Sequence, residues 1–249
     1  MRSLFKHRLF NIASIFCFGY ALVSLLMIFS VDTTVLGINA FIKPMKFGFS
    51  AGILFLTFSW YFTFIPRRLY SSFNRFAWVN VGVMAFELSW ILVQAVRGTL
   101  SHFNMNTPFE GIMFGIMGVS IAISTAWTLL LLRWTWFYDF RINQGLLWAL
   151  RFSILYFVIF GFTGFIMGAQ GAHTVGEADG GAGIPILNWS LQHGDLRISH
   201  FLGLHAMQIL PFLAWLLKLR PLGSFILSAG YGALCFYLLT LALNGVSPL

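Results

Sequence analysis

The chain has 249 residues, of which 59% are hydrophobic and only 9% are charged, and its mean hydropathy of +0.84 excludes an ordinary soluble domain. Apolar runs of about twenty residues recur along it, each long enough to cross about 30 Å of hydrocarbon as a helix. The net charge of +8 does not indicate nucleic-acid binding, because basic residues commonly anchor the loops of membrane proteins and no long basic run is present. The sequence therefore predicts an all-α, polytopic membrane protein that has the lipid bilayer, and no nucleic acid, as a partner.

Seven transmembrane helices are predicted, in a single domain that covers residues 1–249. In chain order the predicted spans are 9–31, 47–65, 76–96, 109–132, 145–168, 198–218 and 222–243, with a long outer loop at 169–197. Two helix starts have clear local signals. Thr107-Pro108-Phe109-Glu110 has the pattern of a capping box with proline at the first helical position, and Asp195 is a predicted N-cap of the sixth span.

The basic residues predict how the chain is oriented. Eleven fall on one side of the predicted spans: Arg2, Lys6, Arg8, Arg67, Arg68, Arg75, Arg133, Arg141, Arg151, Lys218 and Arg220. Four fall on the other side: Lys43, Lys46, Arg97 and Arg197. Because cytoplasmic loops of membrane proteins carry the excess of Lys and Arg, we expect a cytoplasmic N-terminus and a C-terminus outside.

Two ionisable residues are predicted to lie inside the membrane. Glu87 comes ten residues before Arg97, which places it about 15 Å below the outer boundary. His205 lies about 10 Å inside the start of the sixth span. A carboxylate at such a depth costs several kcal/mol unless it is protonated or paired, so intramembrane acids are functional candidates. We expect Glu87 and His205 to carry catalysis or proton relay; the alternative is that each only hydrogen-bonds a neighbouring helix.

Three histidines crowd into HGDLRISHFLGLH, residues 193–205, and suggest a metal or haem. His200 and His205 are five residues apart, a rotation of about 140° on a helix, so they are not expected to bind one ion together. Ligands would have to come from different helices or loops, and the candidates are His102, His173, His200, His205 and Glu87. Haem b suits such separated ligands, with Arg97, Arg197 and Lys46 at the level of its propionates, so the predicted cofactor is haem b or a transition metal ion.

A second pattern favours an anion. Lys43 and Lys46 bracket Pro44 at the start of the second span, where the helix dipole attracts anions. Arg97 lies at the same level, and Arg197 is a further cation on this side. These four cations are the candidate binding residues for a small anionic ligand or a quinone; the alternative is that the lysines anchor lipid headgroups.

Four segments carry a resemblance: GAHTVG, WSLQHGDLRISHFLGLHAMQILP, KPMKF and RGTLSHFN. They resemble a group of uncharacterised bacterial multi-helix membrane proteins, over about half of the chain. The resemblance implies a multi-pass protein of the bacterial inner membrane, and implies no activity and no residue roles.

Three functions remain open from the sequence. The leading hypothesis is a redox-related protein that binds haem or a metal ion in a polar cavity in the outer half of the membrane. The first alternative is a proton-coupled transporter or receptor for a small anionic ligand. The second alternative is an accessory or assembly subunit without catalysis. The sequence leaves open whether the protein is an enzyme and whether it is oligomeric.

Overall fold

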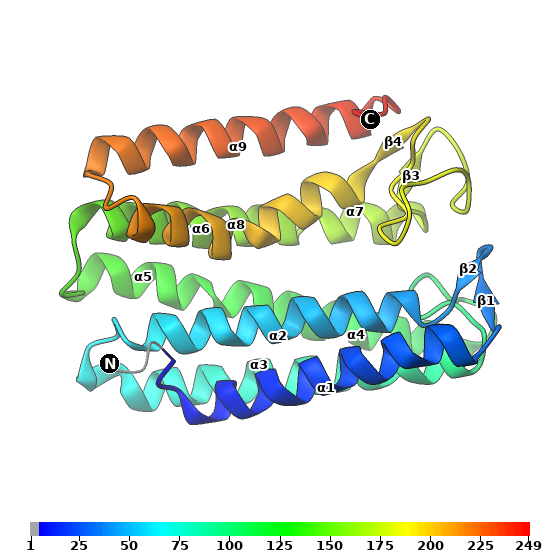
Figure 1. Cartoon of the computed structure of the whole chain (residues 1–249), viewed down its shortest axis with the longest axis horizontal. Coiled ribbons are helices and arrows are strands. Elements are labelled where there is room, and N and C mark those ends of the chain that lie inside the picture. Colours follow the sequence, from blue (N-terminus) through cyan, green and yellow to red (C-terminus); the bar gives the residue numbers. More distant parts are fainter. Residues whose placement is uncertain (1–4) are drawn as a thin grey trace. The chain divides into compact units, whose positions relative to one another are not determined.

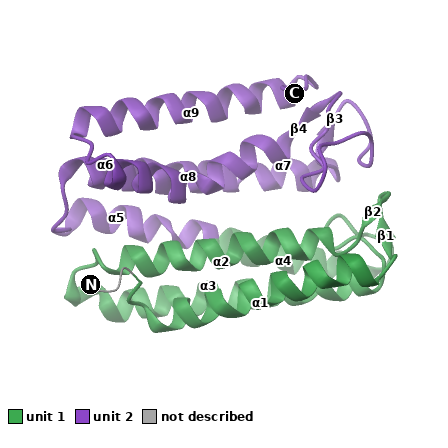
Figure 2. Cartoon of the chain, in the orientation of Figure 1, with its two compact units in different colours: residues 1–124 green, residues 125–249 purple. Residues whose placement is uncertain are grey.

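The computed structural model of the chain describes residues 5–249 and has a nearly all-α fold, as predicted (Figure 1). Arg2, one of the basic residues that predict the orientation, lies outside the described residues. The chain forms two compact units, residues 1–124 and residues 125–249 (Figure 2).

Unit 1 contains three long helices, a short hairpin and the start of a fourth helix. In chain order these are α1 (Arg8–Ser30), β1 (Thr34–Val35), β2 (Ile38–Asn39), α2 (Ile42–Phe62), the 3-10 helix η1 (Arg67–Leu69), α3 (Tyr70–Val96) and α4 (Pro108–Trp127). The two strands are antiparallel, and Leu36 and Gly37 between them both have positive φ, as a tight two-residue hairpin turn requires. The hairpin marks one end of the unit, which we call the hairpin end.

Close packing joins α1 to α2 in unit 1. A Cβ atom added at Gly48 or Gly52 of α2 would come within 2.7 Å of the Tyr20 or Phe18 ring of α1. At the end opposite the hairpin, His7 caps α1 by accepting a hydrogen bond from the Phe10 amide, and its Nε2 lies 2.8 Å from the Asn74 side chain of α3. These contacts hold the three long helices together.

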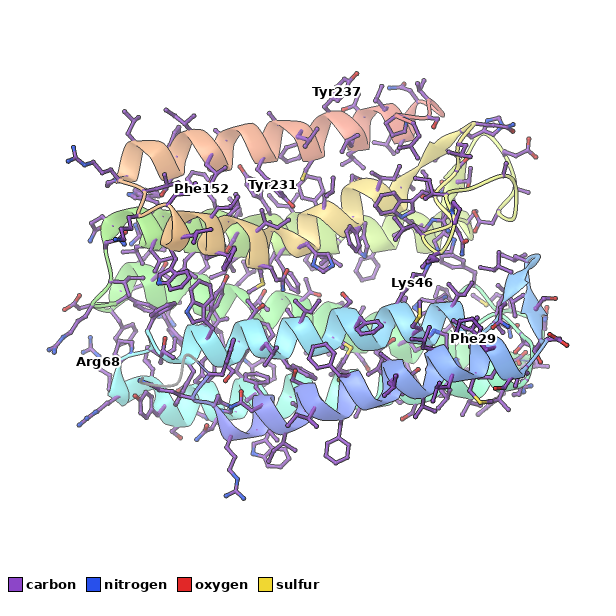
Figure 3. The ribbon with its side chains drawn as sticks, viewed as in Figure 1. Phe29, Lys46, Arg68, Phe152, Tyr231 and Tyr237 are labelled. Carbon is purple, nitrogen blue, oxygen red and sulfur yellow. The ribbon has the colours of Figure 1, made fainter. Side chains whose placement is uncertain are left out.

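Unit 2 contains the rest of the helices and a second strand pair. In chain order these are α5 (Leu129–Phe137), α6 (Gln144–Gly161), α7 (Thr163–Gln170), β3 (Thr174–Val175), β4 (Gly194–Asp195), α8 (Leu196–Leu216) and α9 (Pro221–Leu243). Gly203 of α8 lies directly against the Phe160 ring of α6. Tyr231 lies between α9 and α8, where its hydroxyl donates to the Leu202 carbonyl at 2.6 Å (Figure 3).

Six helical segments among the described residues are long and apolar enough to cross a membrane, which supports a multi-pass membrane protein. They are Arg8–Ser30, Arg67–Val96, Pro108–Phe137, Gln144–Gln170, Leu196–Leu216 and Pro221–Leu243. The predicted span 47–65 corresponds to α2, which has 21 residues but is not among the six. Two predicted spans are each built from two consecutive helices, with breaks at Thr128 and Phe162.

Candidate functional site

The hairpin end of unit 1 holds the candidate site, where α2 begins, α3 ends and α4 begins. Lys46 lies near this end of α2, whereas Arg68 lies at the opposite end of the unit (Figure 3). The start of α4 follows the sequence signal, because Thr107 accepts a hydrogen bond from the Glu110 amide and Pro108 is the first helical residue. The segment 97–107 therefore folds as a fixed connection between two helices.

Lys43 and His102 meet in this site. The Lys43 ammonium lies 3.2 Å from His102 Nδ1, and the Ser101 hydroxyl lies 3.1 Å from the same nitrogen. An ammonium group can only donate hydrogen bonds, so Nδ1 accepts and the ring proton is carried on Nε2. The rings of Phe47, Phe103 and Phe114 surround His102 at centroid distances of about 6 Å. The lysine is thus directed into an aromatic pocket that holds a neutral imidazole.

Glu87 is buried in the middle of α3, with only 4% of its surface exposed. Its Oε1 has no hydrogen-bond partner among the described residues. Lys43 is the charged group that acts on it electrostatically. A buried carboxyl group with an unpaired oxygen is costly, and native proteins keep such groups mainly for function. Lys43 therefore contacts His102 directly and acts on Glu87 through its charge.

Arg97 is engaged with neighbours of its own. Its guanidinium donates to Gln94 Oε1 at 2.8 Å and forms an ion pair with Glu110 at 3.0 Å. Gln94 is fully buried and donates in turn to the Leu100 carbonyl. These bonds tie the end of α3 to the start of α4, so Arg97 supports the site more than it offers a free cation. α3 ends at Val96, where the predicted span 76–96 also ends.

Trp90 is a further residue of interest that no sequence pattern predicted. It lies three residues after Glu87 on α3, is 9% exposed, and its Nε1 has no hydrogen-bond partner among the described residues. Its ring packs beside Phe109 of α4. Tryptophan is common in membrane proteins, so its type gives no signal; only the three-residue spacing from an intramembrane acid marks it out.

In unit 2, residues 171–195 form a lobe that contacts the C-terminal segment through the His193–Val246 bridge and a hydrogen bond from Ser247 to the Ser190 carbonyl. Asp195 is fully buried and caps α8, as predicted, by accepting from the Arg197 amide. The Arg197 guanidinium donates to both carboxylate oxygens of Asp195 and to the Asn188 carbonyl, and the Ser190 amide donates to Asp195 as well. The predicted ligand-binding residue Arg197 thus has a structural partner for its charge.

Two histidines of the lobe lie close to carboxylate groups. His173 Nδ1 lies 2.6 Å from Asp179, which also accepts from the backbone amides of His173 and Thr174. Burial would raise the pKa of Asp179, but the hydrogen bonds and the His173 ring outweigh it and hold that pKa well below its usual value. His193 Nε2 lies 3.8 Å from Glu177, beside a cavity of about 30 Å³ that Arg197 also lines.

The other two candidate ligands lie on α8. His200 Nδ1 is 2.7 Å from the Phe160 carbonyl and 3.0 Å from the Thr163 hydroxyl. His205 packs on the Phe201 ring at 4.2 Å and is hydrogen-bonded to Gln208. Both have partners within unit 2, as helical histidines in an apolar segment require.

The predicted residues thus divide between the units. Unit 1 holds Glu87, Lys43, Lys46, Arg97 and His102, and unit 2 holds His173, Arg197, His200 and His205. Of the first group, Lys43 contacts His102, and its charge acts on Glu87 without a hydrogen bond to Glu87 Oε1. Within residues 5–249, no three His, Cys, Asp or Glu side chains come together in a way that could hold a metal ion.

Comparisons with protein-family models, with curated proteins and with solved structures give no match to this chain. Function is therefore inferred from the chemistry of the residues themselves.

Proposed function

We propose that the protein binds a small organic anion at the hairpin end of unit 1 and couples that binding to protonation of Glu87, as a transporter or a receptor does. The observation that carries the proposal is a buried carboxyl group with an unpaired oxygen, on which the charge of Lys43 acts. Lys43 and His102 Nε2–H are the donors that would hold the anion.

The coupling follows from counting charges. The ammonium group of Lys43 acts on Glu87 electrostatically and favours its ionised form. A bound anion brings a second negative charge to the same ammonium, and two carboxylates that share one cation cannot both remain ionised cheaply in an apolar setting. Glu87 therefore takes up a proton as the anion binds, and releases it as the anion leaves.

For the setting of this site we propose that α2 spans the membrane together with the six other segments. The N-terminus would then be cytoplasmic, the C-terminus outside, and the protein located in the bacterial inner membrane. Support comes from the eleven-to-four division of basic residues. A cysteine accessibility test with a membrane-impermeant thiol reagent checks this topology, using single cysteines that replace Asp32 or Asp139. Labelling of the cysteine at position 139 from the outside contradicts it.

Calorimetry on the detergent-solubilised full chain, in two buffers with different ionisation enthalpies, tests the anion proposal with sodium propionate as the probe. We expect binding with uptake of about one proton per site, since the titration of Glu87 is linked to binding. Glu87→Gln should retain binding and lose the proton uptake. Lys43→Met should weaken binding about tenfold or more, because a charge-assisted contact is removed.

Arg75→Met is the matched control, because it removes an exposed cation of α3 and should leave propionate binding unchanged. If no proton is taken up by the unaltered protein, or if Glu87→Gln takes up as many protons, the coupling is wrong. Counterflow of labelled propionate in proteoliposomes, compared with empty liposomes, then distinguishes a transporter from a receptor.

A haem or metal site in unit 2 is a second candidate, and His200 favours it. Its Nδ1 is oriented by the Phe160 carbonyl, which is how partners outside the coordination sphere commonly orient a ligating histidine. A redox role requires that haem or a metal ion is present in the purified protein. Soret absorbance or stoichiometric metal that is lost in His200→Leu would support this candidate, and protein that is colourless and free of metal would contradict it.

A further inference from the structure

Two buried polar atoms without partners lie one helical turn apart on α3. Glu87 Oε1 and Trp90 Nε1 both lack a hydrogen-bond partner among the described residues, and both side chains are more than nine-tenths buried. Residues three apart on a helix are neighbours on its surface. Leaving a buried polar atom unpaired costs about 1–3 kcal/mol, so two such residues one helical turn apart point to a group that pairs with both.

The chemistry of the two atoms defines this group. The Trp90 indole can only donate, so the group must accept. In the anion-bound state proposed above, Glu87 carries a proton and becomes a donor as well. One oxygen with two lone pairs accepts from both, and a carbonyl or hydroxyl oxygen has that capacity. A purely hydrocarbon substituent leaves both donors unpaired.

We infer that the ligand is a carboxylate with an oxygen on the adjacent carbon, that is, a 2-oxo or 2-hydroxy acid. Its carboxylate would bind Lys43 and His102, and its second oxygen would bind Trp90 and Glu87. The inference rests on the proposed function, and it adds a specificity-determining residue, Trp90, that anion binding alone does not require.

The 2-oxo acid and the 2-hydroxy acid differ in the protonation state of Glu87 that each requires. A 2-oxo oxygen only accepts, so it needs the protonated carboxyl group, whereas a 2-hydroxyl group can also donate to the ionised one. The pH dependence of affinity therefore separates them. Pyruvate should bind more weakly as the pH rises, and lactate should lose less affinity over the same range.

The test compares sodium pyruvate, sodium lactate and sodium propionate by calorimetry on the full chain. At least one of the two oxygenated acids should bind about tenfold or more tightly than propionate, since a hydrogen bond to a charged or fully buried partner is gained. Trp90→Phe keeps the ring and removes the N–H donor. It should reduce that preference to about twofold or less.

Trp78→Phe is the control, because Trp78 is an exposed tryptophan on the same helix. An equal thermal midpoint for the two variants shows that Trp90→Phe still folds. Binding of all three acids with equal affinity, or an unchanged preference in Trp90→Phe, overturns the inference and leaves anion binding in place. Failure of all three to bind overturns both this inference and the proposed function.

Discussion

The lobe of unit 2 and the hairpin end of unit 1 differ in how their buried carboxyl groups are hydrogen-bonded. In the lobe, Asp195 receives four donor groups and Asp179 receives three, so each carboxylate is fully engaged. At the hairpin end, Glu87 keeps one oxygen unpaired, and Trp90 beside it keeps its N–H unpaired. Fully paired charges are typical of structural positions, whereas buried groups with unpaired atoms are candidates for binding a ligand or a proton.

This difference shows that the density of polar residues in a sequence is a poor guide to a site. The segment 193–205 is the most conspicuous in the chain, and its Asp195 and Arg197 hold each other. The functional candidate in unit 1 is a sparse set that comes from three separate segments. Whether a charge has a partner decides between structure and function, and sequence does not reveal partners.

Removing the lobe's central carboxylate should have the largest effect. Asp195→Ala leaves the Arg197 guanidinium without its counter-charge and three backbone or side-chain donors unpaired. We expect a loss of about 3 kcal/mol of unfolding free energy, near the low end for a broken buried ion pair because Arg197 is partly exposed. Thermal unfolding in detergent measures it, with exposed Asp32→Ala as the control. A change below about 0.5 kcal/mol, typical of surface substitutions, contradicts the prediction.

Gly203→Ala should come next, through the packing of α8 on α6. The added methyl group would enter the Phe160 ring, which is fully buried and has no room to move. Overpacking of this kind costs about 1–3 kcal/mol. Gly230→Ala is the matched control, because nothing lies within 4 Å of its Cβ position on α9, and alanine there should be neutral or stabilising. Similar thermal midpoints for the two variants would refute the close contact.

The lobe should also open in acid. Folding holds the pKa of Asp179 below its unfolded value of about 3.9. Its contribution is therefore complete above that pH and is lost as the pH falls further. Hydrogen exchange at the amides of His173 and Thr174, which donate to Asp179, should lose protection below about pH 4, relative to the helical amides of α8. Asp179→Asn should show reduced protection at neutral pH and little change with acid; an unchanged acid response would assign it to another group.

The helices themselves could be predicted well, because apolar runs and capping residues are local signals. Thr107 and Asp195 begin α4 and α8 as their side chains suggest, since a cap needs only the next few residues. The hairpin β1–β2 and the lobe's strand pair had no comparable signal, since their strands have two residues each. The breaks at Thr128 and Phe162 were missed because both helical halves are equally apolar.

The site could be predicted only in part. Depth alone marked Glu87, and the dipole argument marked Lys43, because both depend on position along one helix. That Arg97 is held by Glu110, and that Trp90 has an unpaired N–H, depends on packing among α3, α4 and their connection. Side-chain pairing of this kind is a tertiary property. Charge patterns in the sequence therefore suggest candidate residues, and the structure shows which of them have partners.

The smallest expected effect is the sharpest test of the comparison. Glu87→Leu removes a buried carboxyl group that has an unpaired oxygen, so it should leave the unfolding free energy within about 0.5 kcal/mol or raise it, because an apolar side chain replaces a polar one that is poorly paired. Measured beside Asp195→Ala by the same thermal unfolding, the two acids should then separate by more than 2 kcal/mol. A loss of unfolding free energy comparable with that of Asp195→Ala would make Glu87 a structural residue, because only the removal of a carboxyl group with strong partners destabilises a fold so much. An unchanged unfolding free energy in Glu87→Leu, together with the loss of proton uptake in Glu87→Gln, would mean that Glu87 serves function and not stability.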